Sequence, residues 1–340
     1  MNRRISTLLV ALAPIVAFGV LLALVTVPYV SLGPGPTFDT LGEVEGKEVV
    51  DIEGTEVHPT TGHLNMTTVS QRDNLTLGQA LTLWMAGREQ LVPRDLVYPP
   101  DRSKDEIDEA NNQEFKASED SAEYAALGYL KYAQAVTVET VNKDGASAGK
   151  LEEGDAIEGV NGVPVTDLEQ FQGIMGKTKP GDEVVIDFRR KNAPPGVTTI
   201  KLGSAPDKPQ GILGVGVIEA PWAPFTIDFN LANIGGPSAG LVFSLAVIDK
   251  LTTGDLSGSK FVAGTGTINA DGKVGSIGGI THKILAAHEA GATVFLVPAD
   301  NCEEAKSAHE DGIDLVKVDD LGQAVGALKA LSAGGEAPRC

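Results

Sequence analysis

Ser238 stands where either a nucleophile or a helix cap would be placed. It lies in the glycine-rich run Gly235–Gly240, directly before the apolar stretch Leu241–Ile248. A helix that is apolar on every side must be buried, so we expect Ser238 to lie inside a domain. Its hydroxyl could cap that helix by accepting a hydrogen bond from a first-turn N–H, which is the simpler interpretation of the residue alone. The free N–H groups of such a turn could also stabilise an oxyanion, which is the chemistry of acyl transfer.

Lys283 is a second candidate catalytic residue, and it lies in the first turns of a helix predicted between Gly278 and Gly291. Its neighbours three and four residues away are isoleucine and alanine, so an apolar face would desolvate the amine. A cation near a helix N-terminus also meets the unfavourable end of the helix dipole. Both effects favour a neutral amine, which becomes a base near neutral pH if its pKa falls by about three units from about 10.4. The alternative is a surface lysine whose alkyl chain covers apolar groups.

Together with their flanking residues, Ser238 and Lys283 resemble the proteolytic domain of the Lon family, whose members are Ser-Lys dyad peptidases. The resemblance covers residues 211–298 strongly, and it is weaker at 62–69 and at the helix predicted to end near Leu130. This similarity favours the nucleophile interpretation of Ser238 over the cap. Four further stretches carry the match: 262–266 (VAGTG), 272–279 (GKVGSIGG), 283–288 (KILAAH) and 293–298 (TVFLVP).

The resemblance implies a mechanism and a set of site residues. Ser238 would attack the scissile carbonyl, and neutral Lys283 would take its proton and return it to the leaving amine. Backbone N–H groups of Ser238 and Ala239 would stabilise the oxyanion, and Thr265 matches the family residue that supports the lysine. Gly235 departs from the pattern, because many ATP-dependent members carry an acid there. The glycine and the overall layout are similar to the membrane-anchored, PDZ-bearing branch of the family.

A second resemblance lies in the middle of the chain. Residues 151–162 (LEEGDAIEGVNG) match the pattern L-x-x-G-D-x-I-x-x-V-N-G, which ends in the Asn-Gly pair of a tight hairpin. A predicted strand precedes them at 135–141, and a helix at 167–175 and a strand at 183–190 follow. This order resembles a PDZ domain of the bacterial protease-associated type, which implies that an extended peptide adds to a sheet edge. We expect that edge near 128–138, and the alternative is a PDZ-shaped spacer without a ligand.

The N-terminal segment is strongly apolar. Arg3 and Arg4 precede a stretch, Ile5–Phe38, that has no charged residue, and 5–30 is almost wholly apolar. As a helix, residues 5–30 would span about 39 Å, against about 30 Å of bilayer hydrocarbon. The alternative, a cleaved signal peptide, has a shorter apolar region and a small-residue cleavage site that this segment lacks. We therefore expect one transmembrane helix in the cell membrane, with the N-terminus cytoplasmic and the protease domain extracytoplasmic.

The overall composition excludes some classes of protein. Acidic residues outnumber basic ones by 46 to 27, which gives a formal net charge of −19. Such a chain has no basic surface with which to neutralise phosphates, so nucleic acid is not expected as a partner. Two cysteines cannot make a four-thiolate zinc site, and His282 and His288 do not share one helix face. Neither a metal nor a cofactor is expected, and the sequence leaves open whether Cys302 and Cys340 pair.

These features predict an α+β fold, with a single N-terminal transmembrane helix and a Lon-type α/β protease domain that contains an inserted PDZ domain. Ser31–Pro36 is predicted to be a stiff linker because Pro and Gly break regular structure, and the acidic stretch 101–123 to be a solvated loop. The predicted segments are a cytoplasmic tip (1–4), the transmembrane helix (5–30), a linker (31–37), the N-terminal part of the protease domain (38–130), the PDZ domain (131–204), the proteolytic core (205–332) and a tail (333–340).

Two other patterns point to different chemistry. Residues 236–240 (GPSAG) also fit the G-x-S-x-G nucleophile elbow of α/β-hydrolases. That fold needs Asp and then His after the serine and a longer sheet, whereas only His282, His288 and His309 follow, without an HGGG-type loop. Residues 266–274 (GTINADGKV) approach a phosphate-binding loop, but they have one residue too many between the glycines and lack the final Ser or Thr.

The leading hypothesis is therefore an ATP-independent serine endopeptidase that cleaves unfolded or flexible proteins outside the cytoplasm, with substrate capture by the PDZ domain. Since no room for an ATPase domain remains in the chain, an unfolding motor is not expected. The alternative is a membrane-tethered PDZ scaffold or adaptor with an inactive or latent protease domain. The expected partners are protein or peptide substrates and the membrane. Because Lon-type domains commonly form rings, the resemblance also implies a homo-oligomer, with a hexamer as the expected state.

Overall fold

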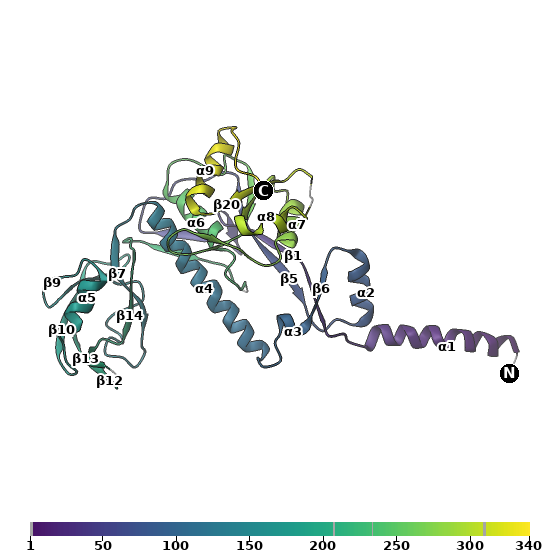
Figure 1. Cartoon of the computed structure of the whole chain (residues 1–340), viewed down its shortest axis with the longest axis horizontal. Helices are drawn as coiled ribbons and strands as arrows, with labels where there is room; N and C mark the ends of the chain where they lie inside the picture. The colour runs from purple at the N-terminus through teal and green to yellow at the C-terminus, as the bar shows by residue number, and fades with distance from the viewer. Residues whose placement is uncertain (1–2, 207, 233, 309–310) are drawn as a thin grey trace.

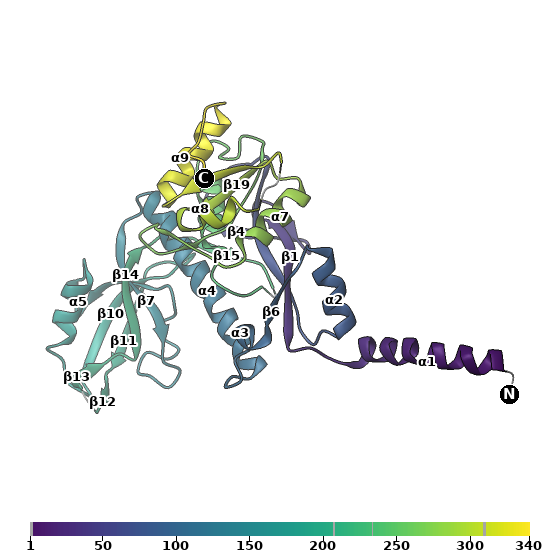
Figure 2. The same cartoon turned by 45° about the vertical axis from the view of Figure 1, so that its right-hand side comes forward.

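The computed structural model describes residues 3–206, 208–232, 234–308 and 311–340, with side chains from Leu8 onward. Figures 1 and 2 show a central body, a second lobe beside helix α4 (Lys104–Tyr129), and helix α1 (Arg3–Leu24), which extends away from the body. Met1 and Asn2 of the predicted N-terminal tip, and His309, lie outside the described residues.

A six-stranded mixed sheet forms the centre of the body, in the order β20-β19-β16-β5-β1-β6. β16 pairs in parallel with β5 and β19, and β19 with β20, whereas β1 pairs antiparallel with both β5 and β6. Strands that precede the second lobe in the sequence and strands that follow it therefore form one sheet. Their bounds are β1 Tyr29–Asp39, β5 His63–Arg72, β6 Gln90–Pro93, β16 Phe261–Gly264, β19 Val294–Pro298 and β20 Asp314–Val318.

The helices of the body pack around this sheet and form its core. α6 (Gly240–Leu251) is buried along nearly its whole length, as its uniformly apolar sequence predicts. α4 and α9 (Leu321–Ser332) lie against α6, and Phe115 of α4 meets Phe243 of α6 edge to face. α7 (Ile280–Ala290) packs against β1 and β5. The starts of α6 and α7 are thus anchored on elements that pack against the sheet and the core.

Helix α4 corrects the prediction of a solvated loop for residues 101–123. The segment is helical from Lys104 to Tyr129, and Ser103 and Glu106 form a capping box at its start. Its many acidic residues concealed a stripe of small and apolar side chains at helical spacing. Composition alone did not distinguish this amphipathic helix from a loop. The buried residues of the helix are Ile107, Phe115, Ser118, Ala122, Ala125, Ala126 and Leu127.

The second lobe has a sheet of its own, in the order β11-β10-β8-β7-β14, with β9 beside β8. Helix α5 (Leu168–Met175) starts at its cap Asp167, as predicted. The Asn161-Gly162 pair turns the β8–β9 hairpin, with positive φ at both residues. The bounds are β7 Gln134–Val141, β8 Ala156–Val160, β9 Val163–Pro164, β10 Glu183–Arg189, β11 Gly196–Lys201 and β14 Val215–Pro221, and β12 Gly203–Ala205 pairs with β13 Lys208–Ile212.

The edge of this sheet does not lie at 128–138, where the sequence placed it. β7 is an interior strand between β8 and β14, and residues 128 and 129 are the end of α4. β14 lies at one edge of the sheet, where it pairs antiparallel with β7. Which strand lies at an edge depends on strand order in the folded sheet, and the order of strands in the sequence does not reveal it.

The structure of the N-terminal segment contradicts the predicted transmembrane helix. Across the part of the chain that the structure describes, no helix is long and apolar enough to cross a membrane. The predicted transmembrane helix 5–30 is therefore wrong, and so is the single-pass location in the cell membrane with an extracytoplasmic protease domain. The helix ends at Leu24 because the residues after it pair elsewhere: Thr26 bridges Thr76, and β1 begins at Tyr29.

The residues predicted to be a linker, 31–37, are instead part of β1. The strand tolerates its two prolines because the pairing with β5 shifts register between Pro34 and Thr37. The hydroxyl of Ser70 donates to the carbonyl oxygen of Pro34, and that of Thr68 to the carbonyl oxygen of Pro36. Side chains of β5 thus satisfy carbonyl groups of β1 where the regular ladder is interrupted.

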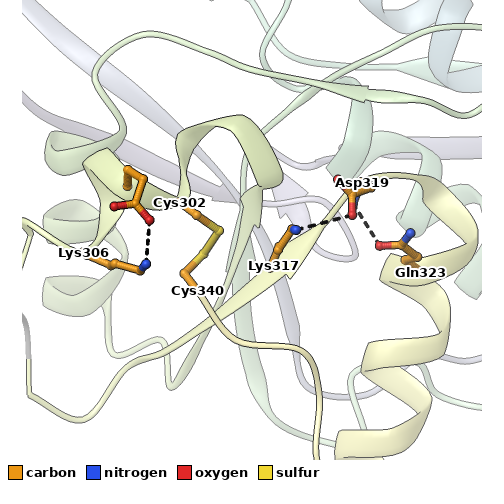
Figure 3. Close-up of a disulfide and its surroundings, with 7 residues drawn as sticks. Cys302, Lys306, Lys317, Asp319, Gln323 and Cys340 are labelled. Carbon is orange, nitrogen blue, oxygen red and sulfur yellow. Dashed lines mark hydrogen bonds and ion pairs between the residues drawn. A yellow bond between two sulfur atoms is a disulfide. The ribbon is translucent and has the colours of Figure 1, made fainter.

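Smaller elements complete the fold, and one covalent link closes its C-terminal end. Cys302 and Cys340 form a disulfide, which decides the pairing that the sequence left open (Figure 3). The short strands are β2 Glu43–Val44, β3 Lys47–Glu48, β4 Val50–Glu53, β15 Thr226–Phe229, β17 Thr267–Ile268 and β18 Val274–Gly275, and the remaining helices are α2 Leu77–Ala86, α3 Arg94–Val97, the 3₁₀-helix η1 Ala299–Asn301 and α8 Cys302–Ala305.

Candidate active site

Ser238 lies just before α6 and does not cap it. Ala239 occupies the N-cap position, and no side chain caps that end of the helix. The hydroxyl oxygen of Ser238 lies 2.6 Å from Nζ of Lys283, which donates a hydrogen bond to it. The structure therefore brings together two residues that are 45 positions apart in the sequence. The capping interpretation of Ser238 is wrong.

Lys283 extends from the first turn of α7 into a buried site. Gly279 precedes the helix with a positive φ of 70°, which only a residue without a Cβ adopts easily. The side chain reaches two hydroxyls, those of Ser238 at 2.6 Å and Thr265 at 3.0 Å, and no ion pair to it occurs among the described residues. Lys283 is only 3% exposed, and this burial lowers its pKa to about 7. A large fraction of the amine is therefore neutral near neutral pH.

Thr265, directly after β16, connects the lysine to the backbone of the serine. Its hydroxyl accepts from Lys283 and donates to the carbonyl oxygen of Ser238 at 3.1 Å. The N–H of Gly266 donates to the same carbonyl oxygen at 3.0 Å. Because Thr265 is fully buried, these bonds do not compete with water, and they hold the three predicted site residues in one arrangement.

Helix α4 supports the loop of Ser238, and the sequence did not reveal this role. The carbonyl oxygen of Asn111 accepts from the N–H of Gly236 at 2.9 Å, and the hydroxyl of Ser118 donates to the carbonyl oxygen of Pro237 at 3.0 Å. A Cβ at Gly235 would lie 2.8 Å from Cβ of Asn111. The glycine that departs from the family pattern therefore permits close contact between the helix and the loop. The capping signal Ser103-x-x-Glu106 could have revealed the helix, but nothing in the sequence places it here.

A pocket of about 340 Å³ opens beside Ser238 and Lys283. Larger cavities occur elsewhere, but this one is adjacent to the serine and the lysine. β5 contributes to its wall where it continues beyond its pairing with β16, which ends at Met66. The pocket is lined by Thr68, Val69, Pro237, Ser238, Thr267, Ser276, Ile277, Gly278 and Lys283.

The remaining predicted residues fall into two groups. Ala239, predicted to supply an oxyanion N–H, is buried next to Ser238 at the start of α6, where first-turn N–H groups lack helical partners. Of the histidines, His282 is buried, and burial lowers its pKa. No hydrogen bond joins a histidine to Ser238 among the residues described, and in that part of the chain no group of His, Cys, Asp and Glu could hold a metal ion.

The chain contains two known kinds of domain. Residues 233–329 match the Lon protease (S16) C-terminal proteolytic domain, and residues 113–200 match the PDZ domain. Each match covers less than a third of the chain.

Curated relatives match a part of the chain. The chain is 47% identical over 68 residues to the Lon protease of Clostridioides difficile (strain 630), a match that covers 20% of this chain and 8% of that protein. It is 40% identical over 89 residues to the Lon protease of Roseiflexus castenholzii, covering 25% of this chain and 11% of the relative. The matches therefore span about a tenth of the length of these relatives.

Solved structures match about a quarter of the chain, with low TM-scores. One is the PDZ domain of the SdrC-like protein from Listeria monocytogenes, with 25% identity, a TM-score of 0.24, and coverage of 25% of this chain and 87% of that chain. Another is a solution structure from Geobacillus thermodenitrificans, with 31% identity, a TM-score of 0.22, and coverage of 24% of this chain and 94% of that chain.

Proposed function

We propose that this protein is an ATP-independent serine endopeptidase in which Ser238 is the nucleophile and Lys283 the general base. One observation carries the proposal: Nζ of Lys283 lies 2.6 Å from Oγ of Ser238 in a buried site, and burial lowers the pKa of this lysine to about 7. A neutral amine at hydrogen-bonding distance from a hydroxyl is the arrangement that general-base catalysis needs.

The hydrogen bonds around Lys283 are consistent with a neutral amine. Nζ lies within hydrogen-bonding distance of the hydroxyls of Ser238 and Thr265, and the hydroxyl of Thr265 donates to the carbonyl oxygen of Ser238. When the amine is neutral, its lone pair would take the hydroxyl proton of Ser238 while one N–H donates to Thr265. Each donor in this ring then has an acceptor. Thr265 thereby orients the lone pair toward the serine proton, which is the supporting role predicted for it.

The reaction would proceed through an acyl-enzyme. Oγ of Ser238 bonds to the scissile carbonyl carbon as its proton moves to Nζ of Lys283. The C–N bond then breaks, and the ammonium of Lys283 gives its proton to the leaving amine. A water molecule attacks the resulting ester with Lys283 again as base, which releases the new carboxyl end and restores Ser238. The backbone N–H groups of Ser238 and Ala239, at the N-terminal end of α6, would bind the oxyanion.

An extended substrate fits the surroundings of the pocket. β5 pairs with β16 only from His63 to Met66, whereas Thr68 and Val69 line the pocket of Ser238. A peptide laid beside this part of β5 would add a strand and bring its backbone to the serine. Such binding requires an unpaired segment of substrate, so we propose that unfolded or flexible proteins are cleaved.

We further propose that the PDZ domain is inserted within the proteolytic fold and captures substrates. β14 lies at one edge of its sheet, and α5 packs near it. A peptide with a free C-terminus could add to that edge. A test would compare a free-carboxylate peptide with its C-terminal amide as competitors. The free acid should slow the cleavage of a protein substrate and leave a short reporter peptide unaffected, and equal inhibition of both substrates would contradict capture.

The deciding experiment uses the whole chain, without ATP, on a reduced and alkylated protein. Ser238→Ala and Lys283→Ala should each abolish cleavage, whereas Lys260→Ala, at an exposed lysine, should retain it. Cleavage that persists in the Ser238 and Lys283 variants would exclude the proposed pair. If the wild-type protein cleaves nothing, the alternative of a PDZ scaffold with a latent protease domain is favoured. A mass measurement on the native protein tests the expected homo-oligomer and its expected hexameric state.

A further inference from the structure

One wall of the pocket beside Ser238 is formed by the segment Ser276–Gly278. This segment leads from the β17–β18 hairpin to α7, the helix that carries Lys283. Sheet pairing does not extend into it, because β18 ends at Gly275. Its position must therefore depend on contacts from another part of the fold.

The side chain of Asn301 supplies these contacts with both of its polar atoms. Oδ1 accepts from the N–H of Ile277 at 2.9 Å, and Nδ2 donates to the carbonyl oxygen of Ile277 at 3.0 Å. The side-chain amide of Asn301 thus hydrogen-bonds both the N–H and the carbonyl of Ile277, as a paired residue of an adjacent β-strand would. Asn301 is only 5% exposed, so water competes little for these bonds. Removal of the amide would leave the N–H and the carbonyl of Ile277 without these partners.

Asn301 is itself held by a covalent anchor. It ends η1, and the next residue, Cys302, begins α8 and forms the disulfide with Cys340 (Figure 3). Ile277, Cys302 and Cys340 belong to the same hydrophobic cluster, which also contains Ile280 of α7. The pocket wall, the anchor and the helix of Lys283 therefore share one packed region.

The C-terminal tail joins this region to the edge of the central sheet. The N–H of Lys317 in β20 donates to the carbonyl oxygen of Pro338 at 2.9 Å, and the N–H of Cys340 donates to that of Leu315 at 3.1 Å. Arg339 bridges Val316 between these two bonds. The tail is thus paired like a short strand, and it fixes one end of the disulfide to β20.

We propose that Asn301 is a positioning residue of the peptidase site. It fixes the wall Ser276–Gly278, against which the substrate side chain next to the scissile bond packs, and the disulfide-tied tail keeps Asn301 in place. This inference rests on the proposed function, because it concerns how a substrate lies against Ser238. Small displacements of a bound substrate reduce the rate strongly, because the reacting atoms must be held at attack distance.

The wall and the base are held by different contacts, which makes the proposal testable. Nζ of Lys283 donates hydrogen bonds to Ser238 and Thr265. The side-chain amide of Asn301 is hydrogen-bonded to Ile277 instead. Loss of the amide should therefore disturb substrate placement and leave the titration of the lysine unchanged. A general loss of structure would instead affect both.

The experiment compares Asn301→Ala with Asn230→Ala in the full-length protein. Asn230 also donates from its side chain to a backbone carbonyl, that of Glu48, but it does not line the pocket. With reporter peptides that differ in the residue before the cut, Asn301→Ala should lower kcat/KM about tenfold and change the order of preference. The acid limb of its pH profile should stay near that of the wild type. Asn230→Ala should keep both the rate and the order.

Asn301→Ala with wild-type kinetics and preference would overturn the proposal. A shift of the acid limb would also overturn it, because the variant would then act through Lys283. A different result would contradict the proposed function itself: cleavage by the Ser238→Ala variant at the wild-type rate.

The tail is tested with Cys302→Ser/Cys340→Ser and with a thiol reductant. The double variant should show the same change of preference to a smaller extent, and reduced wild-type protein should match it. The reductant should not affect the double variant, which controls for other actions of the thiol. Wild-type kinetics in the double variant would overturn the role assigned to the tail.

Discussion

Two lysines of the body are almost equally buried, and they differ in what surrounds them. Lys250 is 4% exposed and Lys283 is 3% exposed. Lys250 lies in the last turn of α6, and its Nζ donates to the carboxylate of Glu48 and the carbonyl oxygen of Val50, each at 2.6 Å. Lys283 lies in the first turn of α7, and its Nζ donates to the hydroxyls of Ser238 and Thr265.

The comparison shows that two almost equally buried lysines can have different electrostatic surroundings. At Lys250 a carboxylate and the C-terminal end of a helix both compensate the positive charge. Among the described residues Lys283 has neither, and burial lowers its pKa to about 7. Lys250 is one partner of an ion pair, whereas Lys283 contacts two hydroxyls and is proposed to accept a proton.

Exchange of each lysine for arginine should produce the largest contrast between the two sites. Lys283→Arg keeps a cation but removes a group that can lose its proton, so kcat/KM for a reporter peptide should fall on the order of 10⁴-fold or more. Lys250→Arg retains the charge and a donor for Glu48, and it should keep most of the activity. Retention of activity by Lys283→Arg would exclude this lysine as the base.

The pH dependence of stability should also separate the two sites. The folded state lowers the pKa of Lys283 to about 7, so between about pH 7 and 10.4 the unfolded chain binds more protons. The free energy of unfolding of the wild type, relative to Lys283→Met, should therefore rise with pH by about 1.4 kcal/mol per unit in this window. Urea denaturation at several pH values measures the difference. A flat difference would show that the folded and unfolded pKa values are alike.

Lys250→Met should destabilise the protein with little direct effect on catalysis. The variant removes the bond to the carbonyl oxygen of Val50 and leaves Glu48 without its partner. Because Glu48 is half exposed, water can solvate it, so we expect a loss of about 2 kcal/mol rather than the larger loss of a fully buried pair. Chemical denaturation gives the value, and peptide cleavage below the unfolding transition provides the control.

The smallest of these effects should come from the support of Lys283 by Thr265. Thr265→Val removes both the acceptor for the lysine and the donor to the carbonyl of Ser238, and it should lower kcat about tenfold. Thr265→Ser keeps the hydroxyl and should restore most of the rate. Equal rates for the Val and Ser variants would show that the hydroxyl has no role.

In the wild type, kcat/KM should rise with pH through about 7, as the neutral amine of Lys283 forms.

Local structure was largely predictable from sequence. The apolar helix after Ser238, the helix closed by Gly291 and the Asn161-Gly162 turn all form as their residue patterns indicate. The C-terminal part of α4 was predicted as a helix, but its first part was taken for a loop because its buried stripe lies within a strongly charged segment. The length of the N-terminal helix was overestimated because hydropathy does not show that its last residues pair with another segment.

Contacts between distant segments were not predictable in the same way. The edge strand β14, the support of the Ser238 loop by Asn111 and Ser118, and the bonds from Asn301 to Ile277 all join residues far apart in the chain. No residue pattern near either partner encodes such a pairing. It depends on how the sheets and helices assemble.

By itself, the sequence determined the chemical types and local settings of the main residues: a serine before a buried helix, and a lysine on an apolar face near a helix start. Tertiary structure alone decided that these two meet at 2.6 Å, and that, within the part of the chain that the structure describes, no carboxylate pairs with Lys283 as Glu48 pairs with Lys250. The physical reason is that a pKa depends on solvation and on charges within a few ångströms. Those neighbours are contributed by elements that come together only in the folded protein.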